Sequence, residues 1–523
     1  MPPPYQDIKV PLRPREIEAA LADLATTYGP LCQRTVFGTK TARGKEHSYI
    51  KIANGSGAKR PAVLIIGGVH ANEWAPPDAL VTFARNLLVS YDTGTDVVFP
   101  AMTVAPNDGP PVAYREWRMK ASDVNAIISA VDLYLFPNVN PDGREWELSH
   151  PTPIGWRKNR RGPANAPYGV DLNRNFDIIR EFEKYYDVAL YKQRYGGSEP
   201  AGTQSSQDTY RGDRHPTTHQ LVTEPEVSHV QQLLDTLPIR YFVDVHMEGR
   251  KILFSWGMEE DGDDPAMRFD SPDPKFIGKR DGLKSDDALW ATPPMQGITD
   301  YKEYLPDDPP HRIRSRAELI ARVMRGSIML AATGHHDPQV TTPQQHYSNY
   351  TVGQSAFLYL PVGGGPNSGC SDDYACSRQF VHPERKPIFA YTLETGHSDE
   401  QGQHPSYDDQ KNHFRKINRE IHAALFGLLQ AAAAGCFIAT AAMGTEDHPD
   451  VEYLRALRDE RLRATPRGAR VADVLNRVYY SFSPAVARYL DVHPRARKTV
   501  RVLVIRPLAA ALRRIFGAEG GGR

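Results

Sequence analysis

Four short apolar runs constrain the fold of this chain most strongly. They cover residues 62–66, 131–136, 241–245 and 388–393, and helical or irregular stretches separate each run from the next. Runs of this length that are rich in β-branched and aromatic residues are typical of strands buried on both faces of a sheet. Because long connections separate them, the pattern predicts an α/β fold.

Two amphipathic helices and one irregular region complete the expected catalytic domain. Ile17, Leu21 and Leu24 share one face of a helix expected over residues 15–27, and a second helix over 411–434 ends at Gly435. Residues 258–345 are rich in Asp and Pro, so we expect an insertion with a helix near 315–332. We therefore predict a catalytic domain over 1–435 and a small, mainly helical domain over 436–523.

The charge distribution supports this division. The chain has 63 Lys or Arg and 63 Asp or Glu, which argues against a nucleic-acid-binding protein, but residues 436–523 alone carry a net charge of +7. No apolar run approaches the ~20 residues that a transmembrane helix needs. Residues 1–10 lack the apolar core of a secretory signal peptide, so we expect a cytoplasmic protein.

Cysteines are too few for a disulfide scaffold in a chain of this length. Cys370 and Cys376 are close enough in sequence that a disulfide within one loop stays possible. The other two are Cys32 and Cys436.

A candidate metal motif follows the first apolar run. His70-Ala-Asn-Glu73 comes directly after Gly67-Gly68, at the end of an expected buried strand, where α/β proteins place functional residues. His397-Ser-Asp-Glu400 has the same spacing but lies in a polar loop. We therefore favour His70 and Glu73 as metal ligands, with a solvated loop as the alternative.

A catalytic zinc ion typically has three protein ligands and a water molecule. His246 ends the run 241–245 and would lie at the same sheet edge as His70 if the two strands are parallel. The alternative is a core histidine at a strand end.

Further motifs complete a family pattern. Trp156-Arg157, then Val170-Asp-Leu-Asn-Arg-Asn-Phe176, and finally Ala390-Tyr-Thr-Leu-Glu394-Thr-Gly396 follow the first histidine motif in order. Over residues 12–430 the chain resembles the pancreatic-type zinc carboxypeptidases. The resemblance implies a mixed twisted sheet flanked by helices, one zinc ion, and an exopeptidase acting on the C-termini of peptides or proteins.

The resemblance also implies residue roles. His70, Glu73 and His246 would bind zinc, Glu394 would be the general base, and Arg157 would stabilise the oxyanion. Asn173 and Arg174 would grip the terminal carboxylate of the substrate. Asp171 would hold a ligand imidazole, or alternatively form a turn.

Two further positions bear on the substrate. Tyr359, followed by Gly363-Gly364, matches the family's mobile tyrosine, although residues 365–369 enlarge the loop. Cys370-Ser-Asp-Asp-Tyr-Ala375 resembles the Gly-Ser-Asp-Asp-Trp-Ala segment of carboxypeptidases that prefer C-terminal Lys or Arg, and Asp372 falls at the specificity position. A solvated turn is the alternative for Asp372. No inhibitory pro-segment precedes residue 12, so we expect no activation cleavage.

The C-terminal segment resembles the bacterial module called the CFI-box. The resemblance rests on Cys436-Phe-Ile-Ala-Thr-Ala-Ala-Met-Gly444, residues 454–459 and residues 479–484, and it points to a bacterial source. Residues 499–516 mix apolar positions with arginines, which is compatible with a helix at an anionic membrane surface. We favour a helical module that docks on a protein partner or on its own acidic catalytic domain.

Two other functions stay open. The same metal site would serve a zinc hydrolase of cell-wall peptides or of acidic side-chain peptides. A peptidase-like binding module without turnover is the alternative outside enzymes, but the three ligands and the base all argue against it. We therefore predict a zinc-dependent metallocarboxypeptidase.

Overall fold

The structure, a computed structural model, describes most of the chain. The described residues are 8–55, 60–286, 288, 291–293, 296, 299–307, 313–334, 342–357, 365–433, 442–443, 449–456, 486, 490 and 493–516. The chain forms two compact units: the first contains Met1–Ala121 and Asp132–Leu428, and the second contains Ser122–Val131 and Leu429–Arg523.

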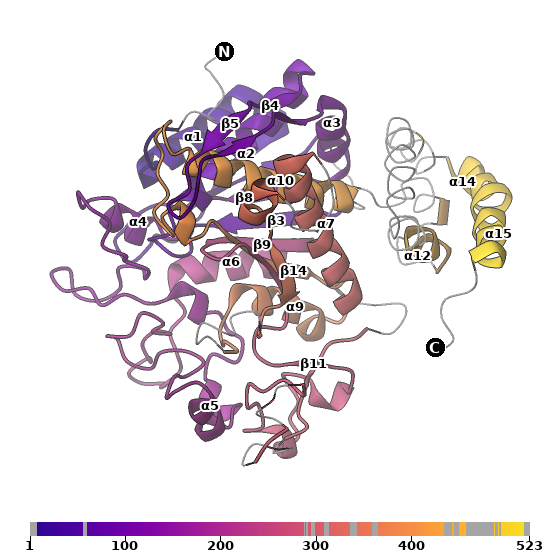
Figure 1. The fold of residues 1–523 in the computed structure, drawn as a ribbon. Helices are drawn as coiled ribbons and strands as arrows, with labels where there is room; N and C mark the ends of the chain where they lie inside the picture. Colours follow the sequence, from indigo (N-terminus) through magenta and orange to yellow (C-terminus); the bar gives the residue numbers. More distant parts are fainter. Residues whose placement is uncertain are drawn as a thin grey trace. The chain divides into compact units, whose positions relative to one another are not determined.

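An eight-stranded mixed sheet forms the centre of the first unit (Figure 1). The strands β8, β3, β9 and β14 are parallel neighbours, whereas β1, β2 and β10 join the sheet through antiparallel pairs. In spatial order they are β1 (Cys32–Val36), β2 (Ser48–Ile52), β8 (Asp132–Phe136), β3 (Ala62–Gly67), β9 (Ile239–Met247), β14 (Phe389–Thr395), β10 (Lys251–Phe254) and β13 (Thr351–Gln354).

The four predicted strands are confirmed as the centre of this sheet. Every residue of β3, β9 and β14 is buried, as expected for strands covered on both faces. Four flanking strands were not predicted. Short two-stranded ribbons lie outside the main sheet and comprise β4 (Val97–Phe99) with β7 (Trp117–Met119), β5 (Met102–Val104) with β6 (Val112–Tyr114), and β11 (Asp261–Gly262) with β12 (Glu303–Tyr304).

The predicted helices are also found. The helix α1 (Pro14–Tyr28) begins with a proline in its first turn and buries Ile17, Leu21 and Leu24, while α10 (His413–Ala433) matches the second predicted helix. The remaining helices of the two units up to residue 433 are α2 (Ala75–Thr93), α3 (Ala121–Ala130), α4 (Pro141–Glu147), α5 (Val188–Arg194), α6 (Pro225–Thr236), α7 (Ile313–Thr333), α8 (Pro343–Tyr347) and α9 (Ser371–Val381).

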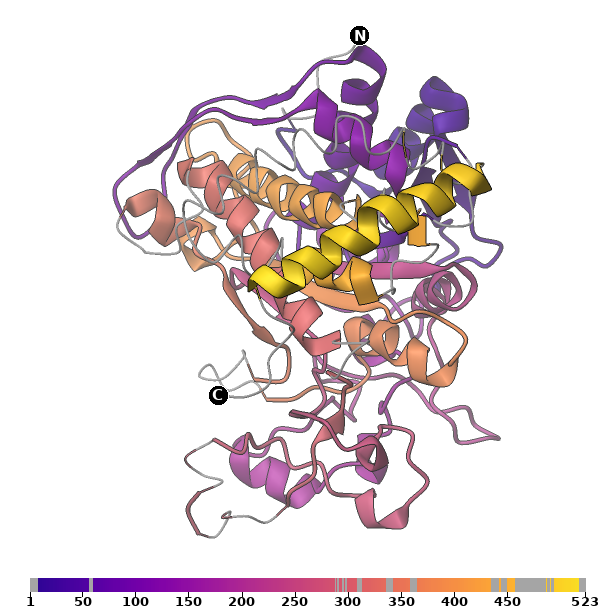
Figure 2. The same ribbon diagram turned by 90° about the vertical axis from the view of Figure 1, so that its right-hand side faces the viewer.

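The region predicted as an insertion contains a core helix. The helix α7 contacts β10, β13 and β14, and it lies beside α10 (Figure 2). Gly427 makes this close approach possible, since a Cβ atom there would come within 2.3 Å of Ser327 Oγ. On its other side α10 is tied to α2 by a hydrogen bond of 2.9 Å from Thr82 Oγ1 to Asn418 Oδ1.

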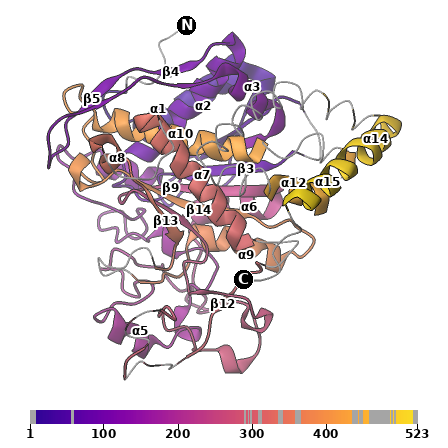
Figure 3. The ribbon, with the colours of Figure 1, turned by 45° about the vertical axis from the view of Figure 1, so that its right-hand side comes forward.

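The first part of that region packs against the segment around α5 (Figure 3). Tyr186 and Arg280 form an isolated parallel bridge, and Tyr195 donates a hydrogen bond to the carbonyl oxygen of Gly282 at 2.7 Å. The buried Arg280 pairs with Glu303, so an internal ion pair helps to order these loops.

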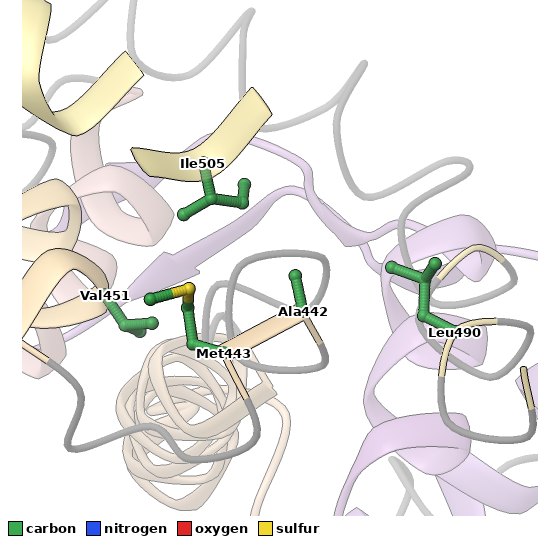
Figure 4. Close-up of a cluster of buried hydrophobic side chains, with 5 residues drawn as sticks. All are labelled: Ala442, Met443, Val451, Leu490 and Ile505. Carbon is green, nitrogen blue, oxygen red and sulfur yellow. The ribbon is translucent and has the colours of Figure 1, made fainter. Parts of the chain in front are cut away.

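The second unit has its own small apolar cluster, formed by Ala442, Met443, Val451, Leu490 and Ile505 (Figure 4). After residue 433 its described helices are α12 (Pro449–Ala456) and a continuous helical stretch made of α14 (Pro494–Val500), a π-helical turn (Arg501–Ile505) and α15 (Arg506–Phe516). Cys436 and the segment 479–484 lie outside the described residues. None of the described helices is both long and apolar enough to cross a membrane.

Candidate metal centre and active site

Two parallel strands bring the predicted metal ligands together. Gly67 at the end of β3 is in register with Val245 of β9, so the loop after β3 lies beside His246. His70 Nδ1 lies 2.6 Å from Glu73 Oε1 and 3.1 Å from His246 Nδ1, and Glu73 Oε2 lies 3.0 Å from His246 Nδ1. All three residues are buried, and their ligand atoms lie within 4.8 Å of one another.

The local backbone explains why the loop can turn so sharply. Gly68 has φ +67°, and a Cβ atom there would lie 2.8 Å from Pro77 Cγ at the start of α2. The turn therefore needs glycine both for its conformation and for space. Glu73 is fixed in addition by the backbone N–H of Met247, which donates to Oε2 at 3.0 Å.

The donor set fits one zinc ion. Two imidazole nitrogens and one carboxylate that converge from a loop and a strand end are the ligands of a catalytic zinc site. Burial opposes ionisation of Glu73, but His70 and His246 outweigh it and hold the pKa of this carboxyl well below its usual range. The cluster thus offers an ionised carboxylate to a cation.

Asp171 contacts the metal ligand His70 on the side of its ring away from the cluster. Its Oδ1 lies 3.2 Å from His70 Nε2 and accepts a hydrogen bond from the backbone N–H of Asn173, while its Oδ2 accepts one from Arg157 Nε at 3.0 Å. Asp171 therefore contacts the ligand imidazole and also forms the turn before the short 3₁₀ helix Leu172–Arg174. Burial raises its pKa, but Arg157 and His70 together bring the pKa well below its usual range.

Glu394 lies next to a metal ligand in the sheet. It is directly opposite His246 in the parallel pair of β14 and β9, and its side chain is 7% exposed. Residues paired in this way project from the same face of a sheet. The predicted general base and the predicted ligand therefore share one face at the carboxyl ends of their strands.

Asn173 and Arg174 form a polar corner between the 3₁₀ helix and α9. Asn173 Oδ1 accepts a hydrogen bond from the backbone N–H of Ser371 at 2.9 Å. Arg174 Nη2 donates to Asn367 Oδ1 at 2.8 Å, and its Nε is buried with no hydrogen-bond partner among the described residues. Both side chains are less than 10% exposed, at 8% and 9%.

Of the two further residues predicted to act on the substrate, Asp372 is described by the structure and Tyr359 is not. Asp372 is buried in the first turn of α9, and its Oδ2 has no hydrogen-bond partner within the described part of the chain. It is therefore not a solvated turn residue. Burial, followed by the carboxylate of Asp244, raises its pKa. Tyr359 lies outside the described residues.

Sequence reasoning missed Asp244. This buried residue of β9 contacts His246, with 2.9 Å between Asp244 Oδ2 and His246 Nε2. The signal was present, because residues two apart on a strand point to the same face. A carboxylate two positions before a candidate ligand could therefore have been predicted to lie beside that ligand.

The second His-x-x-Glu motif forms no part of this centre. His397 is an exposed residue, whereas Glu400 is buried and forms ion pairs with Arg250 at 2.8 Å and with Lys416. Its carboxylate therefore stabilises the packing of α10 against the preceding loop. This agrees with the choice of His70 and Glu73.

Cys370 and Cys376 do not form a disulfide. Cys370 precedes the first residue of the helix and Cys376 lies more than one turn along it, and both are buried free thiols. Helical geometry separates their Cβ atoms beyond the ~4 Å span of a disulfide. Cys32 is likewise free and buried.

Comparisons with known proteins agree with this geometry. The zinc carboxypeptidase family model matches residues 17–416. The chain is 29% identical to mouse carboxypeptidase A4 over 178 residues, which are 34% of this chain and 35% of that protein. It is 30% identical to human carboxypeptidase A1 over 156 residues, 30% of each chain. These alignments span about a third of each curated relative.

Solved structures show the same fold. The crystal structure of thrombin activatable fibrinolysis inhibitor superposes with a TM-score of 0.50 and 16% identity, covering 82% of this chain and 75% of that chain. The family model covers well over half of the sequence and includes His70, Glu73 and His246. The chain belongs to the zinc carboxypeptidase family.

Proposed function

We propose that the protein is a zinc-dependent metallocarboxypeptidase that hydrolyses the C-terminal peptide bond of peptides or proteins. The observation that carries this proposal is the convergence of His70, Glu73 and His246 at the sheet edge where Glu394 lies opposite His246. A site with ligands but without that carboxylate would favour a binding module instead.

The surrounding side chains have the chemistry that hydrolysis needs. When bound, zinc would polarise the scissile carbonyl and lower the pKa of a coordinated water molecule. Glu394 would accept the proton of the attacking water and pass it to the leaving amine. Arg157, oriented by Asp171 through Nε, would donate from its Nη groups to the developing oxyanion.

The corner formed by Asn173 and Arg174 would select a free C-terminus. A guanidinium can bind a carboxylate through two parallel hydrogen bonds, and the Nε of Arg174 has no hydrogen-bond partner among the described residues. Mass spectrometry of a peptide incubated with the zinc-loaded protein tests this. We expect a ladder of products that are shortened one residue at a time from the C-terminus, and no products after chelation. Internal cleavage or no cleavage would contradict the proposal.

We further propose a preference for C-terminal Lys or Arg. The support is Asp372, whose Oδ2 is buried without a hydrogen-bond partner among the described residues. A cationic substrate side chain would supply that partner, whereas an apolar one would leave it unpaired at a cost of ~1–3 kcal/mol.

Two N-acylated dipeptides that differ only in a terminal Arg or Phe test this preference. We expect a higher kcat/KM for Arg in the parent and a loss of that difference in Asp372→Asn. A preference for Phe in the parent would remove Asp372 from substrate recognition. Activity on neither dipeptide would favour a hydrolase of cell-wall peptides or a binding module without turnover.

For the second unit we propose attachment to an anionic membrane surface, in place of the protein docking that the sequence favoured. Residues 493–516 contain seven Lys or Arg and no Asp or Glu. Val502, Leu503, Val504 and Leu508 are exposed on the same helical stretch that buries Ile505 in the apolar cluster. Exposed aliphatic side chains among cations suit the boundary between lipid headgroups and acyl chains.

Co-sedimentation with vesicles tests this attachment. We expect the full chain to bind phosphatidylserine vesicles and not phosphatidylcholine vesicles, and Leu503→Glu to weaken binding. If the parent binds neither vesicle, the membrane proposal is wrong and a protein partner takes its place.

We also propose a cytoplasmic location. The support is chemical: Cys32, Cys370 and Cys376 are all free thiols, as is usual in reducing compartments. The CFI-box resemblance predicts that the source cells are bacterial, and fractionation of those cells tests the location. Recovery of the protein with cytoplasmic markers would support the proposal, and recovery with periplasmic markers would contradict it.

A further inference from the structure

Asp244 touches a metal ligand and the start of a helix at the same time. Its side chain is 0% exposed, and its Oδ2 lies 2.9 Å from His246 Nε2. The same oxygen accepts a hydrogen bond of 2.7 Å from Ser371 Oγ, at the first residue of α9. The carboxylate therefore has one partner on its own strand and one on the helix that packs against it.

The two ligand imidazoles are held in parallel ways. His70 and His246 both direct Nδ1 toward the metal cluster, and a buried carboxylate lies at each Nε2. Asp171 Oδ1 is hydrogen-bonded to His70 Nε2 at 3.2 Å, and Asp244 Oδ2 forms an ion-pair contact with His246 Nε2 at 2.9 Å. A carboxylate at Nε2 favours the tautomer with its proton there, which leaves the lone pair of Nδ1 for the metal.

Ser371 joins the two halves of this arrangement. Its backbone N–H donates to Asn173 Oδ1 at 2.9 Å, and the backbone N–H of Asn173 donates to Asp171 Oδ1 at 3.0 Å. A continuous series of polar contacts therefore runs from His246 through Asp244, Ser371, Asn173 and Asp171 to His70. The residue that follows Ser371 is Asp372, so this series also reaches the position proposed to recognise the substrate.

We propose that Asp244, held by Ser371, is a positioning residue that orients His246 for zinc and couples the metal centre to the first turn of α9. The inference rests on the zinc site of the proposed function. It predicts that loss of either side chain weakens metal binding even though neither one is a ligand.

Zinc affinity, measured by competition with a chromophoric chelator at fixed pH, tests the proposal without substrate. We expect Asp244→Ala to raise the zinc dissociation constant by about 10–100-fold, the usual effect of losing a carboxylate that holds a ligand imidazole. Asp244→Asn should lie in between, because it keeps a polar side chain beside Nε2 but removes the negative charge. Ser371→Ala should raise the constant by about threefold or more.

Ser377→Ala is the matched control. Ser377 is also a buried serine of α9, but its hydroxyl donates to the backbone carbonyl of Tyr374 at 2.7 Å, within the helix. We expect its zinc affinity to equal that of the parent. Should Asp244→Ala fail to fold, the comparison of Ser371→Ala with Ser377→Ala decides alone.

Cobalt substitution supplies a second readout. The visible absorption of Co²⁺ reports ligand geometry, so its bands should shift in Asp244→Asn and stay unchanged in Ser377→Ala. Parent-like zinc affinity in Asp244→Ala, or equal losses in Ser371→Ala and Ser377→Ala, would overturn the proposal. A parent that binds zinc tightly but hydrolyses no peptide would contradict the proposed function and leave this inference standing.

Discussion

Glu394 and His246 lie directly opposite each other in the parallel pair of β14 and β9. Because side chains alternate between the faces of a sheet, a shift of one residue in this register would turn Glu394 away from the metal centre. Glu73 and Glu394 carry the same carboxylate group but have different proposed roles. Glu73 lies within contact distance of both histidines, whereas Glu394 approaches the centre from the neighbouring strand.

Replacing each of these carboxylates by its amide should therefore give different results. We expect Glu73→Gln to lose zinc on dialysis, because a weakly donating amide replaces an ionised ligand, and Glu394→Gln to keep it. Zinc content measured by atomic emission checks both. Equal zinc loss in the two variants would show that Glu394 is needed to hold the metal.

Zinc removal should lower thermal stability. A metal that binds the folded state at about 100 times its dissociation constant contributes ~2.7 kcal/mol, so chelation should lower Tm by several degrees. In His246→Asn this dependence on zinc should disappear. The control is His229→Asn, since His229 is a buried histidine hydrogen-bonded to His47 and not to the cluster. Loss of the zinc effect in the control would contradict the assignment.

The corner at Arg174 should matter only for substrates with a free C-terminus. We expect Arg174→Lys to lower kcat/KM by about 10–100-fold, because a lysine cannot reproduce a bidentate contact with a carboxylate. Arg180→Lys is a suitable control, since Arg180 hydrogen-bonds to Thr223 Oγ1 and lies outside the proposed site. Steady-state kinetics on one acylated dipeptide checks both. An effect of equal size in the control would indicate a structural role for Arg174.

Stability should depend on pH through Glu226. Burial, followed by the nearby Glu224, raises the pKa of this carboxyl from 4.5 to about 8. The folded state therefore binds the proton of Glu226 more tightly than the unfolded chain does. The stability that this proton contributes is complete below the pKa of the unfolded chain and is lost as pH rises toward 8. Between pH 5 and 8 the parent should lose ~3 kcal/mol relative to Glu226→Gln.

Urea unfolding at the two pH values measures this difference. The variant Glu46→Gln removes an exposed carboxylate and should behave like the parent. If the stability of Glu226→Gln falls with pH as steeply as that of the parent, the titration of another group accounts for the slope.

The sequence predicts the centre of the fold better than its edges. The strands β3, β8, β9 and β14 are recognisable because burial on both faces makes them apolar throughout. Of the strands that were not predicted, β1 reads Cys-Gln-Arg-Thr-Val and β13 reads Thr-Val-Gly-Gln, which are too polar or too short to distinguish from loops. Their pairing depends on the strands already in place.

The metal ligands are predictable for a related reason. His70 follows the buried strand β3 and His246 lies near the end of the buried strand β9, and parallel strands end at the same edge of a sheet. The contact between Ser371 and Asp244 joins residues 127 positions apart, so no local pattern announces it. The same holds for α7, because only the folded sheet shows that this helix belongs to the core.

Hydrolysis of one N-acylated dipeptide by the zinc-loaded protein and by Glu394→Gln tests the central claim most directly. We predict release of the C-terminal amino acid by the parent, a rate lower by about 10²–10⁴-fold in Glu394→Gln at full zinc occupancy, and no reaction with the C-terminal amide. Equal rates in the parent and in Glu394→Gln, or no release by the zinc-loaded parent, would contradict the assignment of this site as a carboxypeptidase.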